Sequence, residues 1–142
     1  MYNGTSYHNL DSKGRLAVPA RFRDEEAMPG LVLLNAGNHL VVYTHTHWED
    51  IAEKLNDLSQ LDPKVQAVRR YFIAGAAQCE CDRQGRILLP PTSRQVLSDS
   101  ELALVGMGLS FEIWSKDLWL AEQARVLADM EELGAAVAEL GI

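Results

Sequence analysis

Cysteine is scarce in this chain of 142 residues, which contains only Cys79 and Cys81. Because they are two residues apart, both side chains would lie on the same face of a strand. Two cysteines this close form a disulfide bond poorly, and they provide no disulfide framework that would stabilise a fold. No apolar run approaches the roughly 20 residues that a membrane-spanning helix needs. The N-terminus has neither the basic start nor the apolar stretch of a secretory signal. We therefore expect a soluble, cytoplasmic protein with no membrane partner.

Known catalytic patterns are missing as well. The sequence has no Gly-x-Ser-x-Gly, no phosphate-binding loop, no His-Glu-x-x-His and no paired carboxylates in a recognisable arrangement. His39, His45 and His47, together with the two cysteines, raise the question of zinc. However, Cys-x-Cys lacks the spacing of common zinc modules, and we expect His45 and His47 to share one strand face. The sequence predicts no enzyme, no metal site and no cofactor.

Basic residues are fewer than acidic ones, 13 against 20, and the net charge is -7. Taken alone, this balance argues against nucleic acid as a partner. The distribution changes the expectation, because eleven consecutive residues contain Lys13, Arg15, Arg21 and Arg23 and no acid. Charges are screened over about 10 Å at 0.1 M salt, so a locally basic surface on an acidic protein can hold DNA.

The strongest pattern in the sequence is an internal repeat. Residues 10–23, LDSKGRLAVPARFR, align without a gap with residues 81–94, CDRQGRILLPPTSR. The offset is 71 residues, and the same register also matches Trp48 with Trp119. The identical pairs in this segment are Asp11/Asp82, Gly14/Gly85, Arg15/Arg86, Pro19/Pro90 and Arg23/Arg94. Because these residue types rarely match by chance in one cluster, we conclude that the chain holds two copies of one unit.

Each copy is predicted to contain the same elements. A strand ends near residue 10 or 81, and a tight turn follows at 11–14 or 82–85, where Asp binds nearby backbone and Gly accepts a positive φ. A short strand at 15–18 or 86–89 ends at proline, and a short helix follows at about 20–27 or 91–98. Two more strands come next, at 31–34 and 39–43 or at 102–105 and 110–114. A longer helix closes each copy, with Thr46 and Ser115 as candidate N-caps.

The rest of the chain is expected to be mostly helical. A turn near Pro63 precedes a predicted helix over 64–76, and the segment 121–134 is rich in Ala, Leu and Glu. No linker rich in Gly, Ser or Pro separates the two copies. Four short strands per copy cannot bury a face alone, so we expect the copies to complete one another's sheet.

The recurring pattern is Asp-x-x-Gly-Arg, an apolar strand and proline, followed each time by a hairpin and a helix that bears Trp. This pattern resembles the MraZ family of bacterial transcriptional regulators, and the resemblance covers nearly the whole chain. It implies an α+β, β-rich fold of two tandem swapped-hairpin β-barrel units of the SpoVT/AbrB type, related by pseudo-two-fold symmetry. We accordingly expect one unit at residues 5–47, a second at 76–119 and a helical tail at 120–142.

The resemblance also implies a function. It implies sequence-specific binding of direct repeats in promoter DNA, repression of the protein's own division and cell-wall operon, association with the nucleoid and assembly into homo-oligomeric rings. The expected DNA-binding residues are Lys13, Arg15, Arg21, Arg83 and Arg86, and those expected to shape the two turns are Asp11, Gly14, Asp82 and Gly85. The second copy has Gln84 in place of Lys13 and Thr92 in place of Arg21. We therefore expect the first copy to contact DNA more strongly.

Simpler interpretations remain open at this stage. Arg15 and Arg86 would be structural clasps if they only paired with the aspartates of their own turns, and Arg21 and Arg23 would merely solvate a short helix. The three tryptophans are expected in the core or at a subunit interface. A second class of function is a protein-binding module similar to the antitoxins that share the SpoVT/AbrB unit. Those antitoxins usually carry one unit and a long disordered tail, whereas the tail here looks short and folded.

Overall fold

The computed structural model describes residues 1–23, 30–98 and 100–142. Within these residues the fold is α+β, and its strands pair antiparallel. The elements in chain order are β1 (Thr5–Asn9), β2 (Arg15–Ala17), the 3-10 helix η1 (Ala20–Phe22), β3 (Leu31–Asn35), β4 (Leu40–Thr44), α1 (His45–Asn56), α2 (Pro63–Arg69), the π-helical segment η2 (Arg70–Ala74), β5 (Ala77–Cys79), β6 (Arg86–Leu88), α3 (Pro91–Arg94), β7 (Glu101–Gly106), β8 (Ser110–Ser115), α4 (Lys116–Leu127) and α5 (Met130–Glu139).

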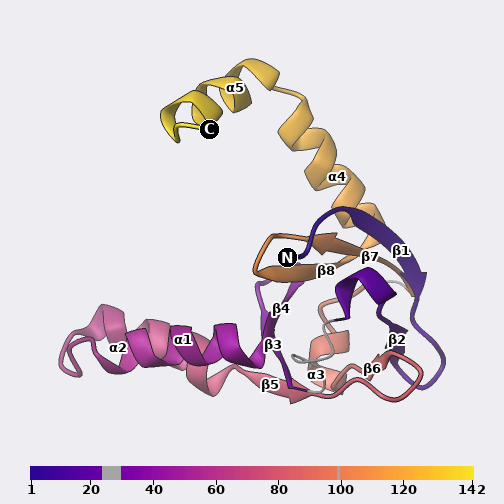
Figure 1. Ribbon diagram of the computed structural model, residues 1–142, viewed down its shortest axis with the longest axis horizontal. Helices are drawn as coiled ribbons and strands as arrows, with labels where there is room; N and C mark the ends of the chain where they lie inside the picture. The colour runs from indigo at the N-terminus through magenta and orange to yellow at the C-terminus, as the bar shows by residue number, and fades with distance from the viewer. Residues whose placement is uncertain (24–29, 99) are drawn as a thin grey trace.

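The strands form one six-stranded sheet and one separate ladder (Figure 1). The sheet has the order β1-β7-β8-β4-β3-β5, and the ladder consists of β2 and β6. Since the order begins at β1 and ends at β5, the two edges do not pair with each other and the sheet is not closed. The expected β-barrels are therefore not what the structure shows. Each copy contributes four short strands. Three of them lie in the six-stranded sheet, and the fourth, β2 or β6, lies in the separate ladder that packs on one face of the sheet.

The internal repeat reappears in the register of the strands. The first strand of each copy pairs with the third strand of the other copy: β1 pairs with β7, and β5 pairs with β3. This confirms that the two copies complete one another's sheet. Leu16 pairs with Ile87 in the ladder, and Val41 pairs with Glu112 in the sheet. Both pairs join equivalent positions of the two copies, so a pseudo-two-fold axis passes through them.

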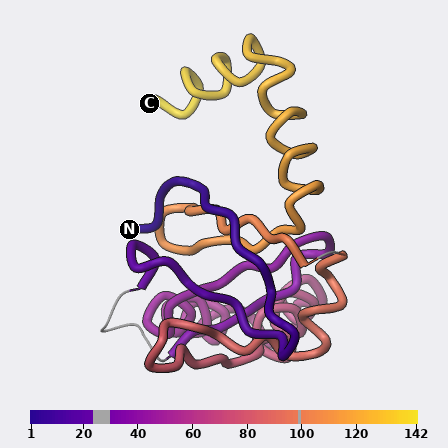
Figure 2. Tube along the Cα trace, turned by 90° about the vertical axis from the view of Figure 1, so that its right-hand side faces the viewer, coloured from indigo at the N-terminus to yellow at the C-terminus, as the bar shows by residue number. Residues whose placement is uncertain are grey.

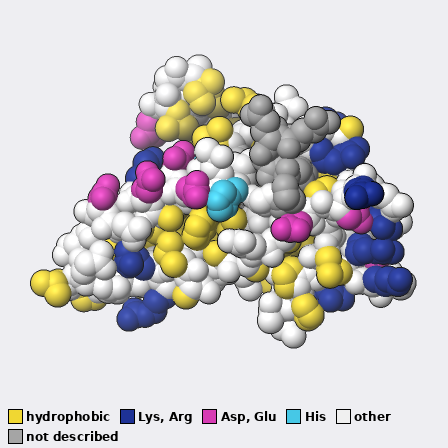
Figure 3. Space-filling view, turned by 60° about the horizontal axis from the view of Figure 1, so that its bottom comes forward, with side chains coloured by type: hydrophobic (Ala, Val, Ile, Leu, Met, Phe, Trp, Pro, Cys, Tyr) yellow, Lys and Arg dark blue, Asp and Glu magenta, His cyan; other side chains and the backbone are white. Residues whose placement is uncertain are grey.

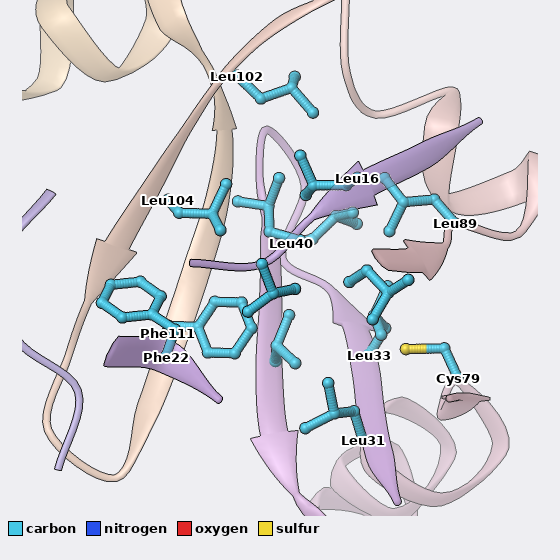
Figure 4. Close-up of a cluster of buried hydrophobic side chains, with 14 of the residues drawn as sticks. Leu16, Phe22, Leu31, Leu33, Leu40, Cys79, Leu89, Leu102, Leu104 and Phe111 are labelled. Carbon is cyan, nitrogen blue, oxygen red and sulfur yellow. The ribbon is translucent and has the colours of Figure 1, made fainter. Parts of the chain in front are cut away.

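The hydrophobic core lies between the sheet and the ladder (Figure 4). Leu16 and Ile87 from the ladder are fully buried against Leu33 and Leu104 from the sheet. The rings of Phe22 and Phe111 close one end of this core at a centroid separation of 5.3 Å, with Tyr2 edge-on to both. Burial of each such side chain contributes about 1.5–3 kcal/mol. The β2–β6 ladder is thereby fixed to the sheet by its inner face, which leaves its outer face to solvent.

Several predicted boundaries differ in detail from the structure. Helix α1 begins at His45, and its N-cap is Thr44, whose hydroxyl accepts a hydrogen bond from the His47 backbone N–H at 3.2 Å. The prediction of Thr46 was therefore wrong, because the chain is still extended at Thr44 and helical beyond it. His45 and His47 consequently lie on a helix rather than on one strand face. Of the helix predicted over 20–27, the described part shows η1 at Ala20–Phe22, and residues 24–27 fall outside the described residues.

Ser115 is the N-cap residue of α4, as predicted, but its hydroxyl serves another purpose. It accepts hydrogen bonds from the Ser98 backbone N–H at 2.8 Å and from the Ser98 hydroxyl at 3.2 Å. Ser115 is fully buried, so these bonds satisfy a polar group that would otherwise be costly to bury. The helix predicted over 91–98 is shorter in the structure, because α3 ends at Arg94.

Two helical arms leave the body of the molecule in different directions (Figures 1 and 2). One consists of α1 and α2, and the other of α4 and α5. The arms account for the predicted helices over 64–76 and 121–134, the latter as two helices with a break between Leu127 and Met130. Across the described residues, none of the helices has the length and apolar character needed to cross a membrane.

Candidate nucleic-acid interface

The turn between β1 and β2 is built around Asp11. One carboxylate oxygen of Asp11 accepts hydrogen bonds from the backbone N–H groups of Lys13 and Arg15, at 2.9 and 2.8 Å. The other oxygen accepts from the Arg15 Nε at 2.7 Å. Gly14 takes a φ of 80°, the left-handed region that glycine adopts without strain. Asp11 therefore fixes both the backbone of the turn and the guanidinium that follows it.

The second copy repeats this geometry almost atom for atom. Asp82 accepts from the backbone of Gln84 and Arg86, each at 2.9 Å, and from the Arg86 Nε at 3.0 Å. Gly85 takes a φ of 78°. The side chains of Arg15 and Arg86 are 31% and 30% exposed, so neither copy presents its arginine more openly. The two turns form as the sequence predicted.

Both arginines are thus held by the aspartate of their own turn, as expected if they act as structural clasps. That contact uses only the Nε edge of each guanidinium. An arginine has a planar fork of five N–H donors, so its two terminal nitrogens stay available to a second acceptor. The clasp therefore orients each arginine without consuming its capacity to bind a base edge or a phosphate.

Hydrogen bonds to the two aspartates lower the pKa of both carboxyl groups in the same way. The Arg15 backbone N–H, followed by the Arg15 side chain, holds the pKa of Asp11 below its ordinary value. Arg86 does the same for the pKa of Asp82. Each donor favours the charged carboxylate, so both clasps are intact at neutral pH.

The ladder brings the two turns together. Arg15 pairs with Leu88 and Ala17 pairs with Arg86, while the central pair Leu16 and Ile87 points into the core. Because side chains alternate along a strand, Arg15 and Arg86 both point outward from the ladder. They occupy diagonal positions on that face, which lie about 7–8 Å apart in an antiparallel pair. Two equivalent arginines therefore share one exposed face, related by the pseudo-two-fold axis.

Each turn also contacts the opposite copy through a second arginine. A β-carbon at Gly14 would lie 2.5 Å from Nη1 of Arg94, and one at Gly85 would lie 2.6 Å from Nη1 of Arg23. Both glycines are buried beneath these guanidinium groups. Sequence reasoning identified Arg23 and Arg94 as an identical pair but gave them no part in the turns. Their repetition at the offset of 71 was the signal for that role.

The remaining predicted DNA-binding residues occupy two places. Lys13 and Arg83 are exposed within the turns of the first and second copy. Arg21 lies apart from the turns, with its guanidinium carbon 5.3 Å from the centroid of the Phe22 ring and its terminal nitrogens beside Gly4. Lys and Arg side chains gather at the right-hand end of the molecule in Figure 3, the end at which the β2–β6 ladder lies in Figure 1. On the face shown in Figure 3, basic side chains of this acidic chain are therefore concentrated at the ladder end.

The residues considered for zinc are not brought together. His39 stacks on Trp114 and approaches a Glu112 carboxylate oxygen at 3.1 Å, whereas His45 approaches Glu49 within α1. Cys79 and Cys81 are free thiols in the described structure, and burial raises the pKa of Cys79 to about 12. No cluster of three or more His, Cys, Asp or Glu residues was found within residues 1–23, 30–98 and 100–142.

Two of the three tryptophans contribute to packing as predicted for core residues. Trp114 is buried, and Trp119 packs against it at a centroid separation of 6.0 Å in a small cluster on the outer side of β7 and β8. Trp114 also donates from its indole nitrogen to Glu112 at 3.1 Å. Trp48 is half-buried on α1, and its indole N–H is buried without a partner among the described residues.

Comparison with known proteins places the chain within one family. A family model described as "MraZ protein, putative antitoxin-like" matches residues 1–71 and again residues 72–135. A protein of Desulforamulus reducens named "Transcriptional regulator MraZ" is 40% identical over 99% of both chains. Proteins of the same name from Desulforapulum autotrophicum and Carboxydothermus hydrogenoformans are 37% identical over the full length of both chains and 41% identical over 84% of both. The chain belongs to the MraZ family, which confirms the resemblance seen in the sequence.

Proposed function

We propose that this chain is a transcription regulator that binds double-stranded DNA with the outer face of the β2–β6 ladder and its two turns. The observation that carries the proposal is the symmetric placement of Arg15 and Arg86. Each is clasped through Nε, leaves its terminal nitrogens open and shares one exposed face with the other. The relatives' name, transcriptional regulator, supports the same function.

The chemistry of this face suits duplex DNA. The arginine fork matches the O6 and N7 acceptors of guanine in the major groove, and a good bidentate pair contributes about 1–3 kcal/mol of base discrimination. A two-stranded ribbon fits that groove. Lys13 and Arg83 extend from the turns on either side and supply flexible charges for phosphate. The aspartates orient the arginines and do not themselves touch the DNA.

The finer assignments form part of the same proposal. Lys13, Arg15, Arg21, Arg83 and Arg86 bind DNA, and the first copy contributes more affinity than the second. The protein binds direct repeats in the promoter of its own operon and represses that operon, in the cytoplasm and at the nucleoid. Residues 5–47 and 76–119 act as the two SpoVT/AbrB-type units, each with a swapped hairpin, and residues 120–142 act as the tail.

Self-assembly is proposed from the two helical arms. The C-terminal arm has several apolar side chains that are largely exposed. Among them are Leu127, Met130, Leu140 and Ile142. A second copy of the chain would bury them, with the α1–α2 arm as the complementary surface, where Lys64 and Arg70 are exposed and face opposite charge on the acidic tail. A head-to-tail contact of two different surfaces gives a ring when the rotation between neighbouring copies closes, and we propose that it closes here. A ring gains avidity on repeated sites.

Fluorescence anisotropy tests the central proposal. The full chain is titrated into a labelled duplex from upstream of its own gene and into a scrambled duplex, at several salt concentrations. We expect tighter binding to the native duplex and a linear fall of log affinity with log salt, because phosphate contacts release counterions. Binding to neither duplex at low salt would overturn the proposal.

A protein-binding, antitoxin-like module is the second candidate. It is favoured by the words "antitoxin-like" in the matching family description and by the exposed apolar residues of the C-terminal arm. In that case the arm would bind a different protein, and the chain would show no preference between the two duplexes. Removal of the arm would then abolish partner binding and leave the anisotropy signal unchanged.

A further inference from the structure

A cavity of about 480 Å³ lies near the N-terminus, on the first copy. Its wall includes Arg21 and Arg23 from η1 and its C-cap, His47 from the first turn of α1, and Leu109 from the link between β7 and β8. Sites for small molecules commonly have volumes of roughly 300–1,000 Å³. The cavity is therefore large enough for a small organic ligand.

The charge of this cavity is positive. Arg21, Arg23 and the terminal residue Met1 contribute to its wall, and none of the described lining residues is acidic. Arg21 lies over the Phe22 ring and Arg23 lies against Gly85. Neither arginine forms an ion pair with a carboxylate of the described residues. Two guanidinium groups with no ion-pair partner among the described residues favour an anionic ligand, and their planar forks match phosphate.

The repeat shows which of these residues the fold itself requires. Arg23 corresponds to Arg94, and both cover the glycine of the opposite turn. Arg21 corresponds to Thr92, and His47 corresponds to Leu118. The second copy reaches the same strand register with Thr and Leu at these positions. Arg21 and His47 are therefore additions that belong to the cavity of the first copy and not to the shared architecture.

We propose that this cavity binds a phosphorylated small molecule and acts as an effector site. The phosphate binds the guanidinium of Arg21, with Arg23 in the same wall, and the organic part lies against Leu109 and Tyr2. His47 donates from Nδ1 to the Leu109 carbonyl at 3.3 Å, which holds the imidazole in the wall. Because Arg23 also contacts Gly85, a bound anion neutralises charge beside the second turn. This last step rests on the proposed DNA-binding function, and it predicts that the ligand weakens DNA binding.

Calorimetry on the full chain without DNA tests the site itself. The probes are ribose 5-phosphate, inorganic phosphate and ribose. We expect saturable binding of ribose 5-phosphate, weaker binding of phosphate and none of ribose. The variants Arg21→Thr and His47→Leu copy the second repeat, so they preserve the fold, and each should weaken binding by about tenfold or more. Lys116→Gln removes a charge at the end of β8 opposite to Leu109 and should leave affinity within about twofold.

The same measurements can overturn the proposal. Absence of saturable binding for all three probes would refute the site, whether or not the chain binds DNA. Equal weakening by Lys116→Gln and Arg21→Thr would show a general charge effect and would also refute it. If Arg21→Thr reduces DNA affinity while no probe binds, the arginines serve the DNA backbone instead.

The coupling to DNA is measured separately. Saturating ribose 5-phosphate should lower the affinity of the native protein for the upstream duplex by several-fold, and this factor should approach one in His47→Leu. Ligand binding with an unchanged DNA affinity would overturn the effector role. Failure of the DNA-binding function would instead appear as no duplex binding with or without ligand.

Discussion

At the scale of single residues, the decisive feature is that each copy uses its aspartate to hold its arginine. The ion pair consumes one edge of each guanidinium and leaves the other edge exposed. This arrangement explains why the repeated Asp and Arg lie four positions apart. The backbone turn brings the carboxylate to the Nε, and the same carboxylate shapes the turn. The fold of each turn and the proposed recognition of DNA therefore depend on the same pair.

The two arginines provide the first prediction. Arg15→Ala should weaken binding of the upstream duplex by about 1–3 kcal/mol, the range of a bidentate base contact. Arg86→Ala should cost less, since the first turn has Lys13 beside its arginine and the second has Gln84 in that place. Anisotropy titrations of both variants give the two losses, and circular dichroism checks that each is folded. Equal losses would contradict the stronger role of the first copy.

The two aspartates provide the second prediction. Their pKa values in the folded protein lie below the ordinary value of 3.8. A carboxylate with a depressed folded pKa stabilises the fold above its unfolded pKa, and this contribution is lost as the pH falls through the folded pKa. We therefore expect carboxyl carbon NMR titrations of Asp11 and Asp82 with midpoints below 3.8, and loss of the clasps only under acid conditions. Midpoints at or above 3.8 would show that the clasps do not form in solution.

At the scale of elements, the important contacts cross from one copy to the other. The turn of each copy is hydrogen-bonded to the strand of the other, with Val18 N–H to the Gly85 carbonyl at 2.8 Å and Leu89 N–H to the Gly14 carbonyl at 3.0 Å. Each turn is also covered by the arginine of the other copy. Neither turn is therefore complete within its own half of the sequence.

The covered turn gives the third prediction. Gly14→Ala should destabilise the protein more than Gly37→Ala. Both glycines have a positive φ, but only Gly14 has a guanidinium where the new methyl group would be placed. The backbone strain of about 1–2 kcal/mol is common to both, so the difference isolates the Arg94 contact. Chemical denaturation measures each free energy of unfolding, and the excess should shrink in an Arg94→Ala background. Equal destabilisation in the native background would contradict a close contact at Gly14.

The exchange of strands gives the fourth prediction. Residues 1–71 expressed alone should be poorly folded, because β1, β3 and β4 lose their partners β7, β5 and β8. Thermal unfolding followed by circular dichroism should show no cooperative transition, in contrast to the full chain. A cooperative melt of the isolated half would mean that it folds alone or pairs with a second copy of itself, and sedimentation would distinguish the two.

At the scale of the whole molecule, a shared core is combined with two projecting arms (Figures 1 and 2). The core joins both copies in one cluster of buried residues, whereas no residue of α4 or α5 is buried. A helix with exposed apolar residues and little contact with the body is an unusual feature for a monomer. This separation of core and arm is what the proposed self-assembly would use.

The arm gives the fifth prediction. A chain that ends at Ala128 loses α5 and its exposed apolar residues. We expect the full chain to sediment as a multiple of 15.8 kDa and the shortened chain as a smaller species. A full chain that sediments as a monomer would contradict the proposed ring. DNA binding to a single half-site should survive the truncation, whereas the avidity for repeated sites should fall.

Much of the fold was predictable because the chain repeats itself. The positions of β1 to β8 and of both turns follow from turn chemistry and apolar alternation that appear twice, so each copy supported the interpretation of the other. The sequence does not identify Thr44 as the N-cap, because Thr44 and Thr46 have the same capping chemistry. The choice between them depends on where the backbone becomes helical, which is at His45. The shape of the sheet was also missed, since local pattern does not state whether its edges meet.

The sequence by itself determined the repeat, the two turns and the arginines that follow them, because Asp and Gly dictate local backbone geometry over a few residues. Only the tertiary structure decided where Arg21, Arg23 and Arg94 lie. Arg23 and Arg94 cross to the turn of the other copy, while Arg21 enters a cavity beside the N-terminus. Such placements depend on which strands pair and in which register, and those contacts join residues that are far apart along the chain.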